Sequence, residues 1–287
     1  MLKRFILAAA LAFAFAAPAG AQPPVWVVRD ADSTIVLFGS VHLLPPGLDW
    51  RPAPLEAALA TADDLWFELP FDAEASRDAS QVAIERGLLP TGETLSSKLS
   101  RKGRKRLAAA AERLGVPMAA LERMRPWLAE ITLGVAELAR NGASGSDGVE
   151  RSILADAPAR ATRRAFETPA QQVGFFADLP EKVQVTSLEH TLKQMKKDPG
   201  AFQKLLDAWL AGDTKKLEKL GLTQMAKATP QVYRALVIER NRRWTDALAQ
   251  RLEGSGETVV VVGAAHLIGK DGVPAMLRAR GISVEGP

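Results

Sequence analysis

The chain has 287 residues, of which 47% are hydrophobic and 24% charged, a composition typical of a globular protein with a sizeable core. It contains no cysteine, which excludes disulfides, thiolate metal sites and cysteine nucleophiles, and imidazole chemistry must come from its three histidines. The formal charge of +4 is too small to argue for a nucleic-acid partner.

The first 21 residues have the pattern of a cleavable signal peptide. Lys3 and Arg4 precede an apolar stretch over 5–18, and Ala19-Gly20-Ala21 carries the small residues that signal peptidase recognises. The apolar stretch is too short to cross a membrane, and no second long apolar run follows. We therefore expect export to the bacterial periplasm or the medium, with no membrane span after cleavage and no nucleic-acid partner.

Short strands and one helix follow the signal segment. The β-branched and aromatic runs 25–28 and 34–38 predict a hairpin, and the Ala-rich stretch 54–62 predicts a helix. A third strand is expected over 65–69 before Pro70 stops it. This alternation of strands with a helix is typical of an α/β unit.

The middle of the chain is mostly helical by its apolar periodicity. We expect a helical insertion over 72–141, which could form a lid, and then a flexible loop over 142–148. Further helices are predicted over 148–157, 169–197, 201–210 and 231–252, with a weakly marked strand over 160–166.

The C-terminal part returns to strands. Residues 258–262 form the most apolar strand candidate, and a helix over 271–280 and an edge strand over 282–284 follow it. We expect a mixed α/β fold: one domain over 22–287, with a central sheet built from strands at both ends of the chain and helices packed on it.

Two histidines occur in matching sequence contexts at the two ends of the chain. Gly39-Ser-Val-His42 and Gly263-Ala-Ala-His266 each follow three apolar strand residues, and a leucine follows each histidine. Gly39 and Gly263 would allow a sharp turn and close backbone approach. Each histidine would then project from the carboxyl end of a strand, where α/β folds place their sites. His190 lacks this context and is expected to be an ordinary helix residue.

Glu68 is the best candidate for a third member of the site. It lies in the strand over 65–69 beside Trp66 and Phe67, where a carboxylate is costly to bury unless it is paired, hydrogen-bonded or metal-bound. We expect this strand to lie beside the one leading to His42. Two imidazoles and a carboxylate form a three-ligand metal site with an open position for water.

Three other acidic residues compete for a place in the site. Glu167 is either a site residue or a charge at a helix N-terminus. Glu150 lies at the start of a predicted helix, where acids are also common, and Asp147 is expected to be a helix cap.

Arg240 and Asn241 lie on the predicted helix over 231–252. They belong either to an exposed basic face or to the site, where Arg240 could bind an anion or stabilise an oxyanion.

The paired GxxH motifs, Phe67-Glu68, Gly148-Val149-Glu150, Glu167-Thr168 and Glu239-Arg240-Asn241 together resemble the TraB/GumN family, a relative of the TIKI proteases. The resemblance implies a mixed α/β fold with helical insertions and a metal-dependent peptidase that uses the two histidines and the glutamate. Remote relatives, the erythromycin esterase-like proteins, are similar in using His and Glu for hydrolysis. Glu150 departs from the commoner Asp, and the strand before Glu167 is unusually rich in Arg.

Three functions remain open from the sequence. The first is an exported metallohydrolase acting on a peptide or small molecule, with zinc, manganese or cobalt on His42, His266 and Glu68. In this version Glu167 or Glu150 completes the metal shell or acts as a base, and Arg240 stabilises the developing oxyanion. The second is a metal-free esterase-like hydrolase with a histidine base that Glu68 orients. The third is a non-enzymatic periplasmic ligand-binding protein.

Overall fold

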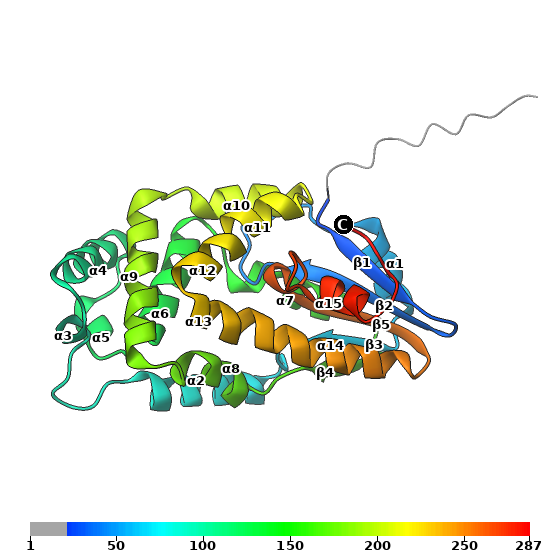
Figure 1. The fold of residues 1–287 in the computed structure, drawn as a ribbon, viewed down its shortest axis with the longest axis horizontal. Coiled ribbons are helices and arrows are strands. Elements are labelled where there is room, and N and C mark those ends of the chain that lie inside the picture. The colour runs from blue at the N-terminus through cyan, green and yellow to red at the C-terminus, as the bar shows by residue number, and fades with distance from the viewer. Residues whose placement is uncertain (1–21) are drawn as a thin grey trace, which may run out of the picture.

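The structure, a computed structural model, describes residues 22–287 (Figure 1). The predicted signal peptide lies outside the described residues. A six-stranded mixed sheet with helices packed on it forms one end of the elongated molecule, and helices alone form the other. The predicted fold class is confirmed.

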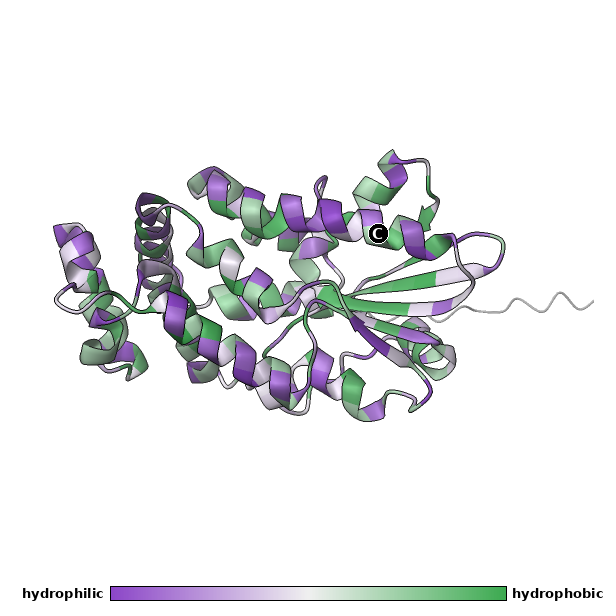
Figure 2. Ribbon diagram, turned by 90° about the horizontal axis from the view of Figure 1, so that it is seen from below, coloured by the Kyte–Doolittle hydropathy of each residue, from purple (hydrophilic) through white to green (hydrophobic). Residues whose placement is uncertain are grey.

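The sheet has the strand order β4-β3-β5-β2-β1-β6. β1 and β2 form the predicted antiparallel hairpin, whereas β2, β5, β3 and β4 run parallel to one another. β2 and β5 are buried along most of their length because helices cover both faces of the sheet (Figure 2), which explains their continuous apolar sequences. The strands are β1 (Val25–Arg29), β2 (Ser33–Ser40), β3 (Asp64–Phe67), β4 (Thr162–Ala165), β5 (Gly256–Gly263) and β6 (Val284–Glu285).

The position of the strand that leads to Glu68 corrects one expectation. β3 does not lie beside β2, because β5 is inserted between them and pairs with both. In the register, Val261 lies opposite Phe38 on one side and opposite Phe67 on the other. The most apolar strand of the chain therefore takes the centre of the sheet, where burial on both faces is greatest.

The helices follow the predicted order, but the sequence did not predict α11 and α12 or the short α3 and α5 individually. The helices are α1 (Ala53–Thr61), α2 (Ala73–Gly87), α3 (Leu95–Lys98), α4 (Arg101–Leu114), α5 (Met118–Glu122), α6 (Pro126–Arg140), α7 (Val149–Asp156), α8 (Pro169–Ala177), α9 (Glu181–Lys197), α10 (Ala201–Leu210), α11 (Thr214–Leu220), α12 (Leu222–Ala228), α13 (Pro230–Tyr233), α14 (Glu239–Leu252) and α15 (Val273–Ala279). Among the described residues, none of them is both long and apolar enough to cross a membrane.

The long helix predicted over 231–252 is interrupted in the structure. A π-helical segment, η2 (Arg234–Ile238), separates α13 from α14. A π turn contains an extra residue, and such segments often occur at functional sites. Arg240 and Asn241 follow this segment closely, as the second and third residues of α14.

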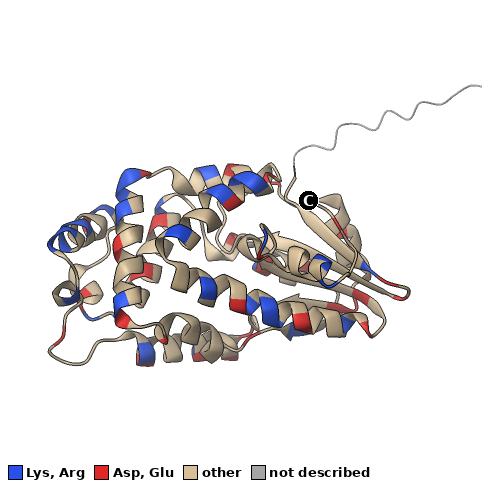
Figure 3. Ribbon diagram, viewed as in Figure 1, with Lys and Arg blue, Asp and Glu red and all other residues tan. Residues whose placement is uncertain are grey.

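Two apolar cores hold the molecule together. The larger surrounds the sheet, and the smaller lies between α3, α4, α5, α6 and α9 and includes Leu107, Leu133 and Leu188. Figure 3 shows Lys and Arg gathered on α4, far from the sheet. The helical section formed by α3, α4, α5, α6 and α9 thus has an apolar core of its own, separate from the core around the sheet.

Candidate functional site

The predicted site residues come together at the carboxyl ends of three parallel strands. His42 follows β2, Glu68 follows β3, and His266 ends η3 (Ala264–His266), a short 3₁₀ helix directly after β5. Carboxyl ends of parallel strands are where α/β folds place their ligands. The matched position of the two GxxH motifs thus has a structural basis in the parallel pairing of β2 with β5.

Gly39 allows the backbone of η3 to approach β2 closely, and it does not form a turn. It lies inside β2 opposite Val262, and it is not among the described glycines with a positive φ. A Cβ on Gly39 would lie 2.9 Å from the Cα of Ala264, so a larger residue would push η3 and His266 away from the sheet. The sharp turn predicted at Gly39 is therefore wrong, and the predicted close approach is what the structure shows.

Glu68 lies between the two histidines. Its Oε1 atom lies 4.0 Å from His42 Nε2 and 3.9 Å from His266 Nε2. The backbone N–H of Gly263 donates to the same oxygen at 2.8 Å, and Gln172 Nε2 donates to Oε2 at 3.3 Å. One carboxylate oxygen therefore faces both imidazoles, although the three residues come from different strands.

The guanidinium of Arg240 fills the other side of Glu68. Nε and Nη2 donate to the two oxygens of Glu167 at 2.8 and 2.7 Å, and Nη2 also donates to Glu68 Oε2 at 2.5 Å. Nη1 donates to His266 Nε2 at 3.0 Å and to the carbonyl of Leu236 at 3.4 Å. All five N–H groups of Arg240 thus have partners, and the predicted exposed basic face does not include this residue.

Glu167 is a buried counter-ion for Arg240. Trp244 Nε1 donates to Glu167 Oε1 at 3.1 Å, and the Trp244 ring lies under the Arg240 guanidinium, 4.7 Å from its Cζ. The alternative of a helix-terminal charge is not what the structure shows, because Thr168 caps α8 with Gln171 in a capping box. The Arg-rich strand before Glu167 is β4, an exposed edge strand, where charged residues are expected.

His42 is held by Glu150, not by Glu68. Its Nδ1 donates to Glu150 Oε1 at 2.7 Å, and Ser40 Oγ donates to the same oxygen at 2.5 Å. The negative charge of Glu150 is the largest effect on the imidazole: it outweighs desolvation and, with the hydrogen bond and Glu68, raises the pKa of His42 to about 9. The His42 side chain is 55% exposed, so the proton that the imidazolium carries on Nε2 can exchange with a ligand or solvent.

His266 is held by Asn241 and kept neutral. Its Nδ1 donates to Asn241 Oδ1 at 2.6 Å, while Asn241 Nδ2 donates to the carbonyl of Asp271 at 2.7 Å. Burial, together with the positive charge of Arg240, lowers the pKa of His266 to about 3. The tautomer therefore carries its proton on Nδ1, and Nε2 presents a lone pair. The predicted role of Glu68 as the orienting partner of a histidine is wrong for both rings.

The charge on Glu68 is stabilised despite its burial. Desolvation opposes ionisation, but the neighbouring His266, Arg240 and His42 and the Gly263 N–H lower its pKa to about 2. Glu68 is therefore an anion at every pH near neutrality.

Several contributors to the site were not predicted. Ser40, Gln172 and Trp244 each donate to a site carboxylate, and Trp244 also packs against the His266 ring at 4.4 Å between centroids. Trp244 could have been found from its spacing, because it follows Arg240 by one helical turn. Asp147 is neither cap nor ligand: it is half-buried and accepts a hydrogen bond from the Ser146 hydroxyl, and α7 begins after Gly148 without a side-chain cap.

The site opens into a cavity of about 430 Å³ with mostly apolar walls. His42, Glu68, Arg240 and His266 line one end of it, and side chains of α10, α11 and α12 line the other. The volume suits a small organic ligand or a peptide side chain. His190 lies elsewhere, on α9, where its Nε2 atom contacts Gln194.

The nitrogen and oxygen atoms of His42, His266 and Glu68 are of the kind that bind a divalent metal, but in the structure they lie too far apart to hold one. Within residues 22–287, no group of three or more His, Cys, Asp or Glu side chains is close enough to hold an ion. His42 Nε2, His266 Nε2 and Glu68 Oε1 are nonetheless the donors that zinc, manganese and cobalt accept, and each imidazole has its Nδ1 fixed by an oxygen, as metal-ligating histidines do. Arg240 Nη1 now takes the position beside His266 Nε2.

Comparison with known proteins gives relatives over nearly the whole chain. The sequence profile of the TraB/PrgY/gumN family matches residues 24–286. The uncharacterized protein YbaP of Escherichia coli (strain K12) is 25% identical over 89% of this chain and 92% of its own length. The Shigella flexneri protein of the same name is 25% identical over 84% of this chain and 87% of its own length. No solved structure matches the chain.

Proposed function

The chain belongs to the TraB/PrgY/gumN family, as its paired motifs predicted, and we propose that it is a hydrolase whose reaction centre is formed by His42, His266 and Glu68. One observation carries the proposal: the Nε2 atoms of both histidines face the same carboxylate oxygen, Glu68 Oε1, at 4.0 and 3.9 Å. Ionisable groups with strongly shifted pKa values that share a cavity are typical of catalytic sites, and two of these three, Glu68 and His266, are also buried.

We propose that the hydrolase uses a divalent metal ion, with zinc, manganese and cobalt as the candidates. His42 Nε2, His266 Nε2 and Glu68 Oε1 would hold the ion, while Glu150 and Asn241 keep the two rings in place through Nδ1. When bound, such an ion supplies an acidic water and polarises a carbonyl. Binding at His266 requires Arg240 Nη1 to leave Nε2, which frees one guanidinium N–H for a ligand oxygen.

Arg240 acts in this account as a positioning residue. It neutralises two buried carboxylates, Glu68 and Glu167, that would otherwise repel each other. Its role as an oxyanion donor is limited to Nη1, because Nε and Nη2 are committed to the carboxylates. The Trp244 ring lies under the guanidinium and stabilises it through a cation–π contact.

The charge of His42 differs between the metal-bound and metal-free versions of the proposal. The ring is exposed, it is paired with Glu150 at 2.7 Å, and its raised pKa makes it an imidazolium at neutral pH. Without a metal ion, this imidazolium can donate its Nε2 proton to a leaving group and then act as a base. An ion on Nε2 would displace that proton, so in the metal version His42 would be a ligand and not the acid.

A second candidate is a metal-free hydrolase. Two contacts favour it: the ion pair of His42 with Glu150, which resembles an acid–base dyad, and the occupation of His266 Nε2 by Arg240. In this version His42 is the general acid and base, and Glu150 orients it.

The test is hydrolysis of a panel of peptides and esters by the chain without residues 1–21, purified without chelator. We expect activity that is lost in His42→Ala and His266→Ala but retained in His190→Ala, the matched control for the third histidine. Loss of activity in EDTA with recovery in manganese, cobalt or zinc supports the metal version, and chelator-insensitive activity supports the dyad. Equal activity of all three variants would contradict both versions.

We also propose export, on the signal-peptide pattern of residues 1–21. Expression of the full chain in a bacterium with an outer membrane, followed by fractionation, tests this. The expected product is found in the periplasm or medium and begins at Gln22. A cytoplasmic, full-length product would contradict it.

A further inference from the structure

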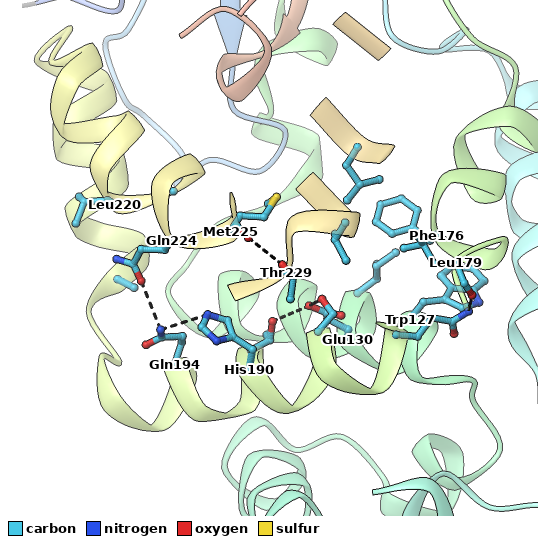
Figure 4. Close-up of a pocket in the computed structure, with 18 of the residues that line it drawn as sticks. Trp127, Glu130, Phe176, Leu179, His190, Gln194, Leu220, Gln224, Met225 and Thr229 are labelled. Atoms are coloured by element: carbon cyan, nitrogen blue, oxygen red, sulfur yellow. Dashed lines mark hydrogen bonds between the residues drawn. The ribbon is translucent and has the colours of Figure 1, made fainter. Parts of the chain in front are cut away.

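A second cavity, of about 400 Å³, lies in the helical section beside the site cavity (Figure 4). α6, α8, α9, α12 and α13 contribute to its walls. It shares three wall residues with the cavity at His42 and Glu68: Leu205, Gly221 and Met225. The two cavities are therefore neighbours, and a ligand bound at one could extend toward the other.

Glu130 is a carboxylate in the wall of the second cavity that no basic side chain of the described wall neutralises. Ser187 Oγ and Thr191 Oγ1 donate to its Oε1 atom at 2.9 and 2.6 Å. Figure 4 shows Glu130 between the His190 end and the Trp127 end of the cavity. Among the described residues, no hydrogen bond reaches Glu130 Oε2 and no Lys or Arg pairs with this carboxylate.

The rest of the cavity offers no positive charge to Glu130. Its described wall contains no Lys or Arg, and its other acid, Asp198, already pairs with Lys204 at 2.7 Å. Desolvation, with a smaller effect of Lys193, lowers the pKa of His190, so this ring is neutral at pH 7. Desolvation likewise raises the pKa of Glu130, although the two hydroxyl donors oppose the shift.

Aromatic and aliphatic side chains line the same cavity as Glu130. Trp127 and Phe176 stack with their ring centroids 6.1 Å apart, and Leu179 and Leu236 extend the apolar wall. Apolar walls around one carboxyl suit an ammonium or guanidinium group on a hydrocarbon stem, because such a cation needs both a counter-ion and a surface for its methylenes. A hydrated inorganic ion would gain nothing from these walls.

We propose that this second cavity is a binding site for an organic cation, a primary ammonium or guanidinium group on an apolar stem, with Glu130 as its counter-ion. Its adjacency to the site cavity makes it a specificity pocket for a basic side chain or amine of the substrate. That last step rests on the proposed function, whereas the binding of the cation does not.

The experiment is calorimetric titration of the chain without residues 1–21 with n-hexylamine and with 1-hexanol, its neutral counterpart of similar length, at pH 7.5. We expect the amine to bind at least about tenfold more tightly than the alcohol, the order of effect of a partly buried charged hydrogen bond. Glu130→Gln should remove this preference without weakening the alcohol. Glu74→Gln, an exposed glutamate on α2, is the matched control and should change nothing.

Equal binding of amine and alcohol by the unmodified protein overturns the proposal, as does failure of both to bind, and neither result depends on any variant folding. Unchanged amine binding by a folded Glu130→Gln also overturns it. Thr191→Val, which removes one donor to Glu130, provides a milder variant and should alter the amine affinity alone. His42→Ala should keep the amine preference, so loss of the proposed hydrolysis and loss of this pocket are distinguishable.

Discussion

Glutamates organise this site at the scale of single residues. Glu150 fixes one imidazole, Glu68 faces both, and Glu167 holds the arginine that balances Glu68. Each is buried, and each has its charge matched by a specific partner, as the cost of burying a carboxylate requires. The two histidines consequently have opposite properties: His42 is protonated and exposed, and His266 is neutral and buried.

The pairing of His42 with Glu150 can be tested directly. Glu150→Gln removes the negative charge that is the main cause of the raised pKa, so the pKa of His42 should fall from about 9 toward its ordinary value near 6.5. NMR titration of the imidazole measures this. Asp147→Asn changes an acid three residues earlier that is not among the groups shifting the His42 pKa, and it should leave that pKa unchanged. A pKa that stays near 9 in Glu150→Gln would contradict the assigned pair.

His266 gives the folded protein a sensitivity to acid. Its pKa is lowered on folding, so the unfolded chain binds the proton more tightly, and stability present above pH 6.5 is lost as the pH falls toward 3. The loss is at most about 1.4 kcal/mol for each pH unit in that window. Urea unfolding between pH 6.5 and 5 should show this slope and a flatter one in His266→Gln. The same slope in both proteins would contradict the assignment.

The sequence predicted most of the site residues because their types are unusual where they occur. A buried glutamate beside Trp66 and Phe67 is costly unless it is paired, hydrogen-bonded or metal-bound, and the two histidines follow apolar strands in matching sequence contexts. Which acid serves which histidine was not predictable, because that depends on the position of α7, which follows a loop without periodicity. The start of α7 carries Glu150 to His42, and no local pattern encodes this contact.

At the scale of elements, the close approach of α7 to β2 is what joins Glu150 to His42. Gly148, immediately before α7, lies so near the chain after β2 that a Cβ there would be 2.0 Å from the carbonyl oxygen of His42. The backbone N–H of Val149 donates to the carbonyl of Val41 at 3.2 Å, which fixes the same approach. Gly148 is therefore needed for this close contact, whereas the sequence predicts a flexible loop over 142–148.

Gly148→Ala should therefore destabilise the protein by about 1–3 kcal/mol, the usual cost of inserting a methyl group into a packed contact. Gly134→Ala is the control: it lies within α6, no described atom is within 4 Å of its Cβ position, and it should be neutral or stabilising. Chemical unfolding of both variants measures the difference. Equal stabilities of the two variants would mean that Gly148 is not a close-contact glycine.

The order of the strands could not be predicted by reading along the chain. Sequence proximity favours β2 beside β3, whereas β5, which comes much later in the chain, pairs with both of them in the interior of the sheet. The predicted helix over 231–252 likewise omitted η2, because a π turn leaves no reliable trace in apolar periodicity. Long-range pairing and local helix irregularity are the two features that the sequence alone did not supply.

At the scale of the whole molecule, the helical section carries its own core and places two cavities in a row from the sheet edge outward. The mixed α/β class and the origin of the sheet at both chain ends were predictable, because the apolar pattern changes from strand-like to helical and back. The second core could not be predicted, because α9 lies outside the predicted insertion over 72–141 and contributes Leu188 and Leu192 to it.

Leu133→Ala tests the independence of that second core. Leu133 is fully buried in it, so the substitution should cost about 2–5 kcal/mol of unfolding free energy, whereas Val135→Ala, on the exposed side of the same helix, should cost little. The pKa of His42, measured by NMR in the folded variant, should remain near 9 because the site rests on the sheet core. A shifted pKa in Leu133→Ala would show that the two cores are coupled.

The central claim is that two histidines from opposite ends of the chain and Glu68 form one metal-binding reaction centre. X-ray absorption at the metal edge of the chain without residues 1–21, loaded with one equivalent of zinc, tests it most directly. The account predicts two imidazole nitrogens in the first coordination shell, reduced to one in either His42→Ala or His266→Ala and unchanged in His190→Ala. A zinc shell without imidazole, or one that neither substitution changes, would contradict it.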